Sequence, residues 1–308
     1  MKAVIKTENL SRWYGNVLGV SEISLGIEPG IKGLLGPNGA GKSTFMKLVC
    51  GQLKPNLGTI TINGEPIFAN FPLFAKIGYC PEHECYYKGN TGWEQVYFRA
   101  QLNGYDLGTA IKKTTQAIDR VGLLDSKDKY IREYSLGMRQ RLKLAVSIVN
   151  EPDILLLDEP LRGIDPLWRM RIIQLIKDYG KAGKTVIVSS HVLPEIEEMT
   201  DDIILIHQGK VFAQGDIHYI RGLLDSHPHM ISVSCTDPRK LAGILLENDY
   251  ITNIQFDENG KKVVFNTRKR DLFFDLLNRI IVDHDIEVTE ITSPDDNLQA
   301  VFDYLVGK

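Results

Sequence analysis

The chain has 308 residues, 43% of them hydrophobic, and its 36 Lys and Arg against 39 Asp and Glu give a formal net charge of −3. A chain of this length predicts about two domains, each able to bury a core of its own. The nearly balanced charge argues against a surface built wholly for nucleic acid.

No apolar run approaches the length of about 18 residues that a membrane-spanning helix needs. Residues 1–12 carry charged side chains with no long apolar run after them, which argues against a secretory signal. Four cysteines do not resemble a disulfide framework. We therefore expect a soluble, two-domain protein of a reducing, cytoplasmic compartment.

The first part of the chain predicts strands and a helix around a glycine-rich loop. Strand Val20–Ile27 ends at a Pro-Gly turn and is followed by the short apolar strand Ile31–Leu35. The glycine-rich loop at 36–44 then opens a helix at Phe45–Leu53. Strand Thr59–Ile62 precedes an Asn-Gly pair, which is typical of one arm of a hairpin.

The pattern from Trp93 to Asn150 is mostly helical, because apolar residues recur there at helical spacing. Strand character returns at Ile154–Leu157, Thr185–Ser189 and Ile203–His207, with a helix at Arg169–Tyr179. Strands that alternate with helices predict a mostly parallel sheet and an α/β fold.

A second, smaller domain is predicted after residue 224, and residues 225–229 are expected to form the linker. The expected elements are strands 231–235, 251–256, 262–265 and 286–291 and helices 238–248 and 269–282. Their order is that of a small α+β ferredoxin-like domain. Ser293, Pro294 and Asp296 form a capping pattern that predicts a final helix. We therefore expect one domain at 1–224 and another at 225–308.

Residues 36–43 match the phosphate-binding pattern G-x-x-x-x-G-K-[ST] at every fixed position. Glycines let backbone N–H groups cradle phosphate oxygens, and the following helix adds its positive N-terminus. Lys42 is expected to reach the β- and γ-phosphates, and the Ser43 hydroxyl to complete the coordination of magnesium. The residues expected to surround the phosphates of a bound nucleotide are Gly36, Pro37, Asn38, Gly39, Ala40, Gly41, Lys42, Ser43 and Thr44.

An acidic pair follows the apolar strand Ile154–Leu157. A buried strand delivers Asp158 to the edge of the sheet, where its carboxylate can hold magnesium. Glu159 beside it is expected to orient and deprotonate the attacking water. The two motifs together predict hydrolysis of a nucleoside triphosphate.

Further motifs, in a fixed order, resemble those of the ATP-binding cassette (ABC) ATPases over roughly residues 1–220. They are Tyr14 as an adenine-stacking aromatic, Gly78–Glu82 as a loop that senses the γ-phosphate, Tyr134-Ser135-Leu136-Gly137 as the signature sequence, Asp165 in a D-loop, and His191 after a strand as the switch histidine. The resemblance implies a P-loop NTPase with a RecA-like core, an antiparallel β subdomain and a helical signature subdomain at about 93–150.

The resemblance also implies a mechanism that needs two cassettes, with a second, identical chain as the expected partner. They would face each other head to tail around two ATP molecules. Ser135 and the N–H of Gly137 would bind the γ-phosphate of the partner's ATP, and His191 would contact the γ-phosphate in cis as a catalytic residue beside Glu159. Glu82 would face the nucleotide and its magnesium.

Two positions depart from the usual family pattern, which has Gly at 136 and Gln at 82. Leu136 would interfere only if the backbone there needs positive φ. Glu82 keeps an oxygen that can face magnesium or water, but it lacks an amide donor and adds charge. Both variants resemble those of drug- and polysaccharide-type export ATPases. On the signature helix, Arg139, Arg141 and Lys143 form a basic stripe that we expect to be a solvated face, with a role in placing the helix near a partner's phosphate as the alternative.

These observations predict the ATPase subunit of an ABC exporter, held at the inner face of the cell membrane by separate permease subunits. The helical region and the loop at 82–91 would meet the permease. A soluble ABC ATPase that acts on nucleic acid or ribosomes is the alternative, but the chain has neither sustained heptads nor a second P-loop. A degenerate cassette that does not hydrolyse ATP stays open because of Leu136 and Glu82.

Overall fold

The computed structural model describes residues 4–84, 86–87, 89–217, 229–257, 259–284 and 286–293. The chain divides into two compact units, Met1–Asp216 and Ile217–Lys308, and each is described by itself. The helix predicted from Ser293 and most of the predicted linker lie outside the described residues.

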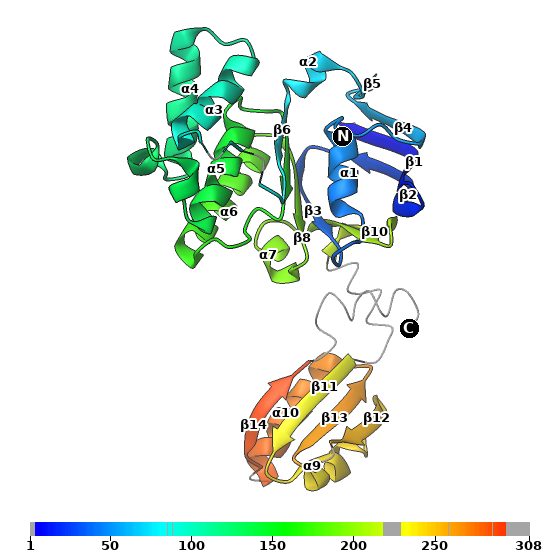
Figure 1. The fold of residues 1–308 in the computed structure, drawn as a ribbon. Coiled ribbons are helices and arrows are strands. Elements are labelled where there is room, and N and C mark those ends of the chain that lie inside the picture. Colours follow the sequence, from blue (N-terminus) through cyan, green and yellow to red (C-terminus); the bar gives the residue numbers. More distant parts are fainter. Residues whose placement is uncertain are drawn as a thin grey trace. The chain divides into compact units, whose positions relative to one another are not determined.

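The centre of the first unit is a six-stranded sheet in the order β10-β9-β3-β8-β7-β6 (Figure 1). Its strands are β3 (Gly30–Leu35), β6 (Ile77–Cys80), β7 (Ile154–Asp158), β8 (Thr185–Ser190), β9 (Asp202–His207) and β10 (Lys210–Asp216). All neighbours are parallel except β9 and β10, so the predicted parallel sheet is confirmed. Every residue of β7 and β8 is buried, as expected where helices cover both faces.

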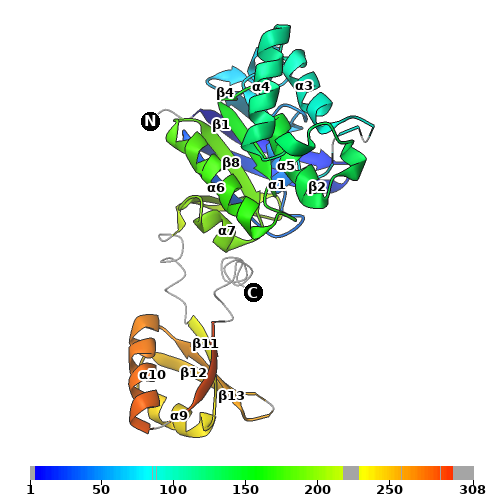
Figure 2. The same cartoon turned by 90° about the vertical axis from the view of Figure 1, so that its left-hand side faces the viewer.

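Helices pack on this sheet and place their N-termini at the carboxyl ends of the strands (Figure 2). They are α1 (Lys42–Val49), α6 (Pro166–Lys181) and α7 (Leu193–Glu197), which follow β3, β7 and β8, whereas the short α2 (Phe71–Phe74) precedes β6. α1 contacts β7, and α6 contacts both β3 and β8. The loop that opens α1 therefore lies at the edge where β7 and β8 end.

A second sheet in this unit is antiparallel, in the order β2-β1-β4-β5. Its strands are β1 (Ile5–Tyr14), β2 (Val17–Ile27), β4 (Leu57–Ile62) and β5 (Glu65–Pro66). Asn63 and Gly64, which join β4 to β5, both have positive φ, as the tight turns of hairpins require. This sheet is the antiparallel subdomain that the family resemblance implies.

The helical region contains α3 (Gly92–Leu102), α4 (Leu107–Arg120) and α5 (Leu136–Ile148), with short 3-10 turns at Leu124–Ser126 and Ile131–Glu133. Thr91 and Glu94 form a reciprocal capping box at the start of α3. None of the described residues forms a helix long and apolar enough to cross a membrane.

The basic residues of α5 do not form the solvated face that we predict from the sequence. Arg141 is only 9% exposed, donates to two backbone carbonyls after α4, and lies 4.3 Å above the Trp168 ring. Lys143 is buried and donates to two carbonyls just after β6. Arg139 pairs with Glu84. The prediction was wrong because the carbonyl groups that accept hydrogen bonds from Arg141 and Lys143 belong to other segments of the chain, which the pattern of this helix does not reveal.

The second unit has an antiparallel sheet in the order β12-β13-β11-β14. Its elements are β11 (His229–Cys235), α9 (Pro238–Leu245), β12 (Ile251–Phe256), β13 (Lys262–Thr267), α10 (Arg270–His284) and β14 (Val288–Thr292). Phe265 and Phe273 are fully buried between sheet and helices. The order of elements and strands confirms the predicted ferredoxin-like domain.

Candidate functional site

The glycine-rich loop between β3 and α1 needs its glycines for different physical reasons. A Cβ at Gly36 would lie 2.3 Å from the carbonyl oxygen of Ile206. Gly41 has a φ of 107°, and a Cβ there would lie 2.5 Å from the carbonyl oxygen of Gly19. Gly39 also has positive φ but has open space around it. Larger residues would therefore clash at 36, be strained at 39, and suffer both penalties at 41.

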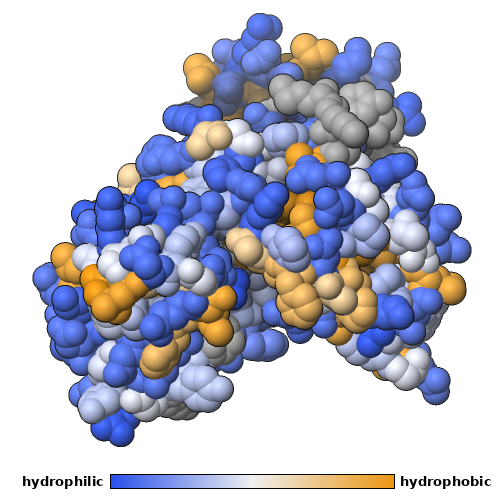
Figure 3. All heavy atoms as spheres, turned by 90° about the horizontal axis from the view of Figure 1, so that it is seen from above, coloured by the Kyte–Doolittle hydropathy of each residue, from blue (hydrophilic) through white to orange (hydrophobic). Residues whose placement is uncertain are grey.

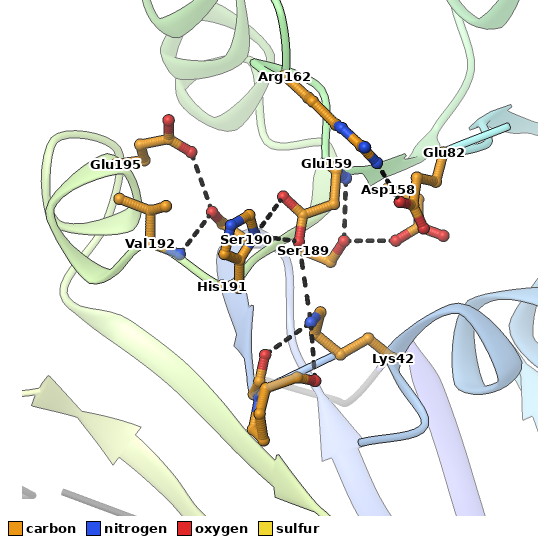
Figure 4. A network of polar contacts seen from close by, with 12 residues as sticks. Lys42, Glu82, Asp158, Glu159, Arg162, Ser189, Ser190, His191, Val192 and Glu195 are labelled. Atoms are coloured by element: carbon orange, nitrogen blue, oxygen red, sulfur yellow. Dashed lines mark hydrogen bonds and ion pairs between the residues drawn. The ribbon is translucent and has the colours of Figure 1, made fainter. Parts of the chain in front are cut away.

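Lys42 is buried at the first position of α1. Its Nζ donates to the carbonyl oxygen of Gly36 at 2.6 Å and to that of the next residue at 3.3 Å, and it lies 3.8 Å from Glu159 Oε1 (Figure 4). Burial lowers the pKa of Lys42, while the negative charges of Glu159, Asp158 and Glu82 act in the opposite direction. The ammonium thus sits where the loop and three carboxylates converge.

Asp158 ends β7 and is almost completely buried. Its Oδ1 accepts a hydrogen bond of 2.6 Å from the Ser189 hydroxyl, which in turn accepts from the backbone N–H of Glu159. Asp158 Oδ2 has no hydrogen-bond partner among the described residues. An unpaired carboxylate oxygen near the Ser43 hydroxyl in one pocket is an oxygen donor set that fits Mg²⁺.

Glu159 stands in a strained backbone position with a φ of 50°, which costs about 1–3 kcal/mol in a residue other than glycine. Gln140 donates to its carbonyl oxygen at 3.1 Å. Both carboxylate oxygens lie 3.0 Å from Nδ1 of His191, whose side chain is half exposed (Figure 4). The strained turn thus holds the Glu159 carboxylate between Lys42 and His191.

One pocket of about 250 Å³ collects most of the predicted site residues from segments far apart in the chain. It is lined by Tyr14, Val17, Leu18, Gly19, Pro37, Asn38, Gly39, Ala40, Gly41, Lys42, Ser43, Thr44, Glu82, Asp158 and Glu159. Val17, Leu18 and Gly19, the first three residues of β2, were not predicted from the sequence. They lie just before the strand predicted at Val20–Ile27, and no motif marks them.

The signature residues do not line this pocket. Ser135 caps α5 by accepting the N–H of Met138 at 3.2 Å, and Gly137 lies close to the backbone of Gly163. Leu136 begins α5 outside the positive-φ region and is 55% exposed. The departure from glycine at 136 therefore causes no backbone strain.

Two long-range contacts at the site were also not predicted from the sequence. Arg162 donates from Nη1 to Glu82 Oε1 at 2.6 Å, although the two residues are 80 positions apart. Gln140 reaches from α5 to the carbonyl oxygens of Glu159 and Pro160. No spacing rule in the sequence marks either contact, because each depends on how distant loops meet.

A P-loop, a buried Asp–Glu pair and a histidine against that glutamate define a P-loop ATPase. The family model described as ABC transporter matches residues 20–162. The bacitracin transport ATP-binding protein BcrA of Enterococcus faecalis is 33% identical over 100% of this chain and 97% of its own length. The daunorubicin/doxorubicin resistance ATP-binding protein DrrA of Streptomyces peucetius is 32% identical over 83% of this chain and 78% of its own.

Solved structures agree with this fold. The ATP-binding subunit of an ABC transporter has a TM-score of 0.66 at 25% identity and covers 72% of this chain and 93% of its own. The dimeric cassette MJ0796 has a TM-score of 0.65 at 23% identity, and the match covers 69% of this chain and 98% of that one. At this identity the similarity supports the fold alone. The chain belongs to the ATP-binding subunits of ABC transporters, which bind ATP and hydrolyse it to drive transport.

Proposed function

We propose that this chain is the motor of an ABC exporter and works as a pair of identical cassettes. The observation that carries the pairing is that Ser135 and Gly137 sit at the exposed start of α5 and not in the pocket of their own chain. The positive end of α5 then serves the γ-phosphate of ATP bound by a second copy. Residues 1–224 form the ATPase domain, and 225–308 an accessory domain.

A cross-link between copies tests this pairing. A chain with Asn38→Cys and Ser135→Cys, in a Glu159→Gln background that retains ATP, is expected to form a covalent dimer on oxidation only when ATP is present. Gel electrophoresis without reductant measures the dimer fraction. Matched controls carry one of the two cysteines. A dimer that forms equally without ATP, or no dimer at all, contradicts the head-to-tail pair.

Magnesium is proposed to lie among Ser43, Asp158 and Glu82, all of which line the pocket. When bound, it neutralises phosphate charge and polarises the bond that breaks. The unpaired Asp158 Oδ2 supports this placement. The ring of Tyr14, which is 42% exposed at the pocket, stacks on adenine.

Hydrolysis is assigned to Glu159 and His191. Among the residues that the structure describes, Glu159 is the one carboxylate that contacts both Lys42 and His191, so it is placed to take the proton of the attacking water. His191 orients that carboxylate and presents its exposed edge to the γ-phosphate. Lys42 stabilises the charge that develops on the phosphate oxygens.

A groove of about 490 Å³ beside the helical region is the proposed contact for the permease. It lies between α1, β6, α3 and α5, and its described lining includes Lys47 and Arg99 but no carboxylate. Burial lowers the pKa of Arg99. Figure 3 views the face that carries α2, α3 and α4, where hydrophobic side chains gather in several separate patches. Phe71 on α2 and Leu102 on α3 are 77% and 80% exposed.

Docking at this groove would place the chain at the inner face of the membrane. Export as the direction follows from the names of its relatives, a bacitracin transporter subunit and a drug-resistance subunit. A permease in a neighbouring reading frame, with about six spanning segments, is the expected partner.

Arg99→Glu is expected to lower co-purification with that permease at least about tenfold, because it reverses charge in a half-desolvated groove. ATP affinity should stay within about twofold, since Arg99 does not line the nucleotide pocket. The measurement is pulldown from detergent-solubilised membranes. Lys112→Glu makes the same charge change on the exposed face of α4 and serves as control. Undiminished capture of the permease by the Arg99 variant would place docking elsewhere.

A further inference from the structure

An ion pair joins two loops at the nucleotide pocket. Glu82 follows β6 and lines the pocket, whereas Arg162 lies in the turn after Glu159. Arg162 Nη1 donates to Glu82 Oε1 at 2.6 Å (Figure 4), and the side chains are 66% and 29% exposed. The backbone N–H of Arg162 also donates to the carbonyl oxygen of Glu159 at 3.3 Å. The pair therefore connects the loop after β6 to the turn that carries Glu159.

The charges around the pocket indicate what this ion pair does. Glu82, Asp158 and Glu159 all line it, and among the described lining residues Lys42 is the one basic side chain. The charge of Glu82 is close enough to influence the pKa of Lys42. Before the charge of magnesium is counted, a polyphosphate that enters such a pocket meets two uncompensated carboxylates, which weakens its binding. Arg162 neutralises one of them.

The Glu82 loop is held from two directions. Lys143 on α5 donates at 2.7 Å to the carbonyl oxygens of both Pro81 and Glu82, which fixes the backbone. Arg162 then fixes the side chain from the opposite loop. Removing Arg162 leaves the backbone in place and frees only the carboxylate, so the effect of the pair on nucleotide binding is separable from folding.

We propose that Arg162 is a positioning residue that neutralises Glu82 and holds its carboxylate at the nucleotide pocket. The Glu82–Arg162 pair then presents a combined neutral group at the pocket, as an uncharged glutamine at position 82 would. This inference rests on the proposed role of Glu82 beside the nucleotide. The inference implies that a carboxylate at position 82 is compatible with tight nucleotide binding only when position 162 carries a cation.

A double-mutant cycle tests the proposal with the affinity for the fluorescent nucleotide mant-ATP as its readout, measured on the full chain. Arg162→Ala is expected to raise the Kd about three- to fivefold at low salt, with a smaller effect at high salt because exposed pairs are screened. In a Glu82→Gln background the same substitution should change the Kd by less than about 1.5-fold. Arg162→Lys should recover part of the loss.

Lys181→Ala removes one exposed positive charge at the end of α6 and controls for net charge. The midpoint of thermal unfolding without nucleotide, measured for all variants, shows whether the fold is kept. An Arg162→Ala effect of equal size in the wild-type and the Glu82→Gln backgrounds overturns the inference. A wild-type chain that does not bind mant-ATP would instead contradict the proposed nucleotide site, so the two failures are distinguishable.

Discussion

Glu159→Gln is expected to lower the rate of ATP hydrolysis by about 10²- to 10⁴-fold while leaving ATP bound. The amide has nearly the same shape and keeps the strained turn, but it cannot accept the proton of the attacking water. It also removes one negative charge beside Lys42, so the affinity for ATP should stay equal or rise. Phosphate release measures the hydrolytic rate, and mant-ATP fluorescence measures binding.

Glu195→Gln is the matched control, because Glu195 is a nearby carboxylate that bonds Ser190 and Arg169 and does not line the nucleotide pocket. It should change the hydrolytic rate by less than about threefold. A Glu159 variant that hydrolyses ATP at the wild-type rate would remove this residue from the mechanism. A wild-type chain that binds ATP and does not hydrolyse it would instead support the degenerate cassette.

The parts of the site that the sequence predicts well are those that local chain geometry determines. The P-loop is a continuous segment in which Gly39 and Gly41 have positive φ, a requirement of the local backbone. Asp158 and Glu159 follow a fully buried strand, so their place at the sheet edge follows from the strand itself. Such residues can be identified from a linear pattern because the interactions that fix them involve only a few neighbouring residues.

Elements with weak patterns were not predicted from the sequence. Strand β1 carries polar residues and three register shifts against β2, which break the alternation that identifies a strand. Strand β6 has only four residues, and one of them is Gly78, which is required because a Cβ would lie 2.1 Å from the carbonyl oxygen of Ser147. Tertiary contact, and not local propensity, fixes both strands.

Long-range polar contacts are the part of the structure that no linear sequence pattern predicts. Arg141 looks like a solvated residue in its helix, yet it is buried against Trp168 and two carbonyls from another loop. Arg162 and Glu82 meet only because β6 and β7 are neighbours in the sheet. The sequence shows which residues are charged, but only the fold shows which of them come into contact.

Lys42→Ala is expected to weaken mant-ATP binding by about 100- to 1,000-fold, or about 3–4 kcal/mol, which lies within the cost of truncating one partner of a buried charge pair at a binding interface. The substitution takes away the one basic side chain among the described residues that line the pocket, and it leaves three carboxylates facing the incoming phosphates. Hydrolysis then falls because ATP is not retained, whereas Glu159→Gln stops hydrolysis with ATP bound.

Lys47→Ala provides the matched control, because Lys47 lies on the same helix and does not line the nucleotide pocket. Its affinity for mant-ATP should remain within about twofold of wild type. Thermal unfolding without nucleotide shows whether the Lys42 variant is folded, because removing the ammonium relieves its own desolvation but leaves the buried Glu159 carboxylate without this cation. A folded Lys42→Ala chain that binds mant-ATP normally would mean that the phosphates lie outside this loop, because no other described cation of the pocket can replace the lost charge.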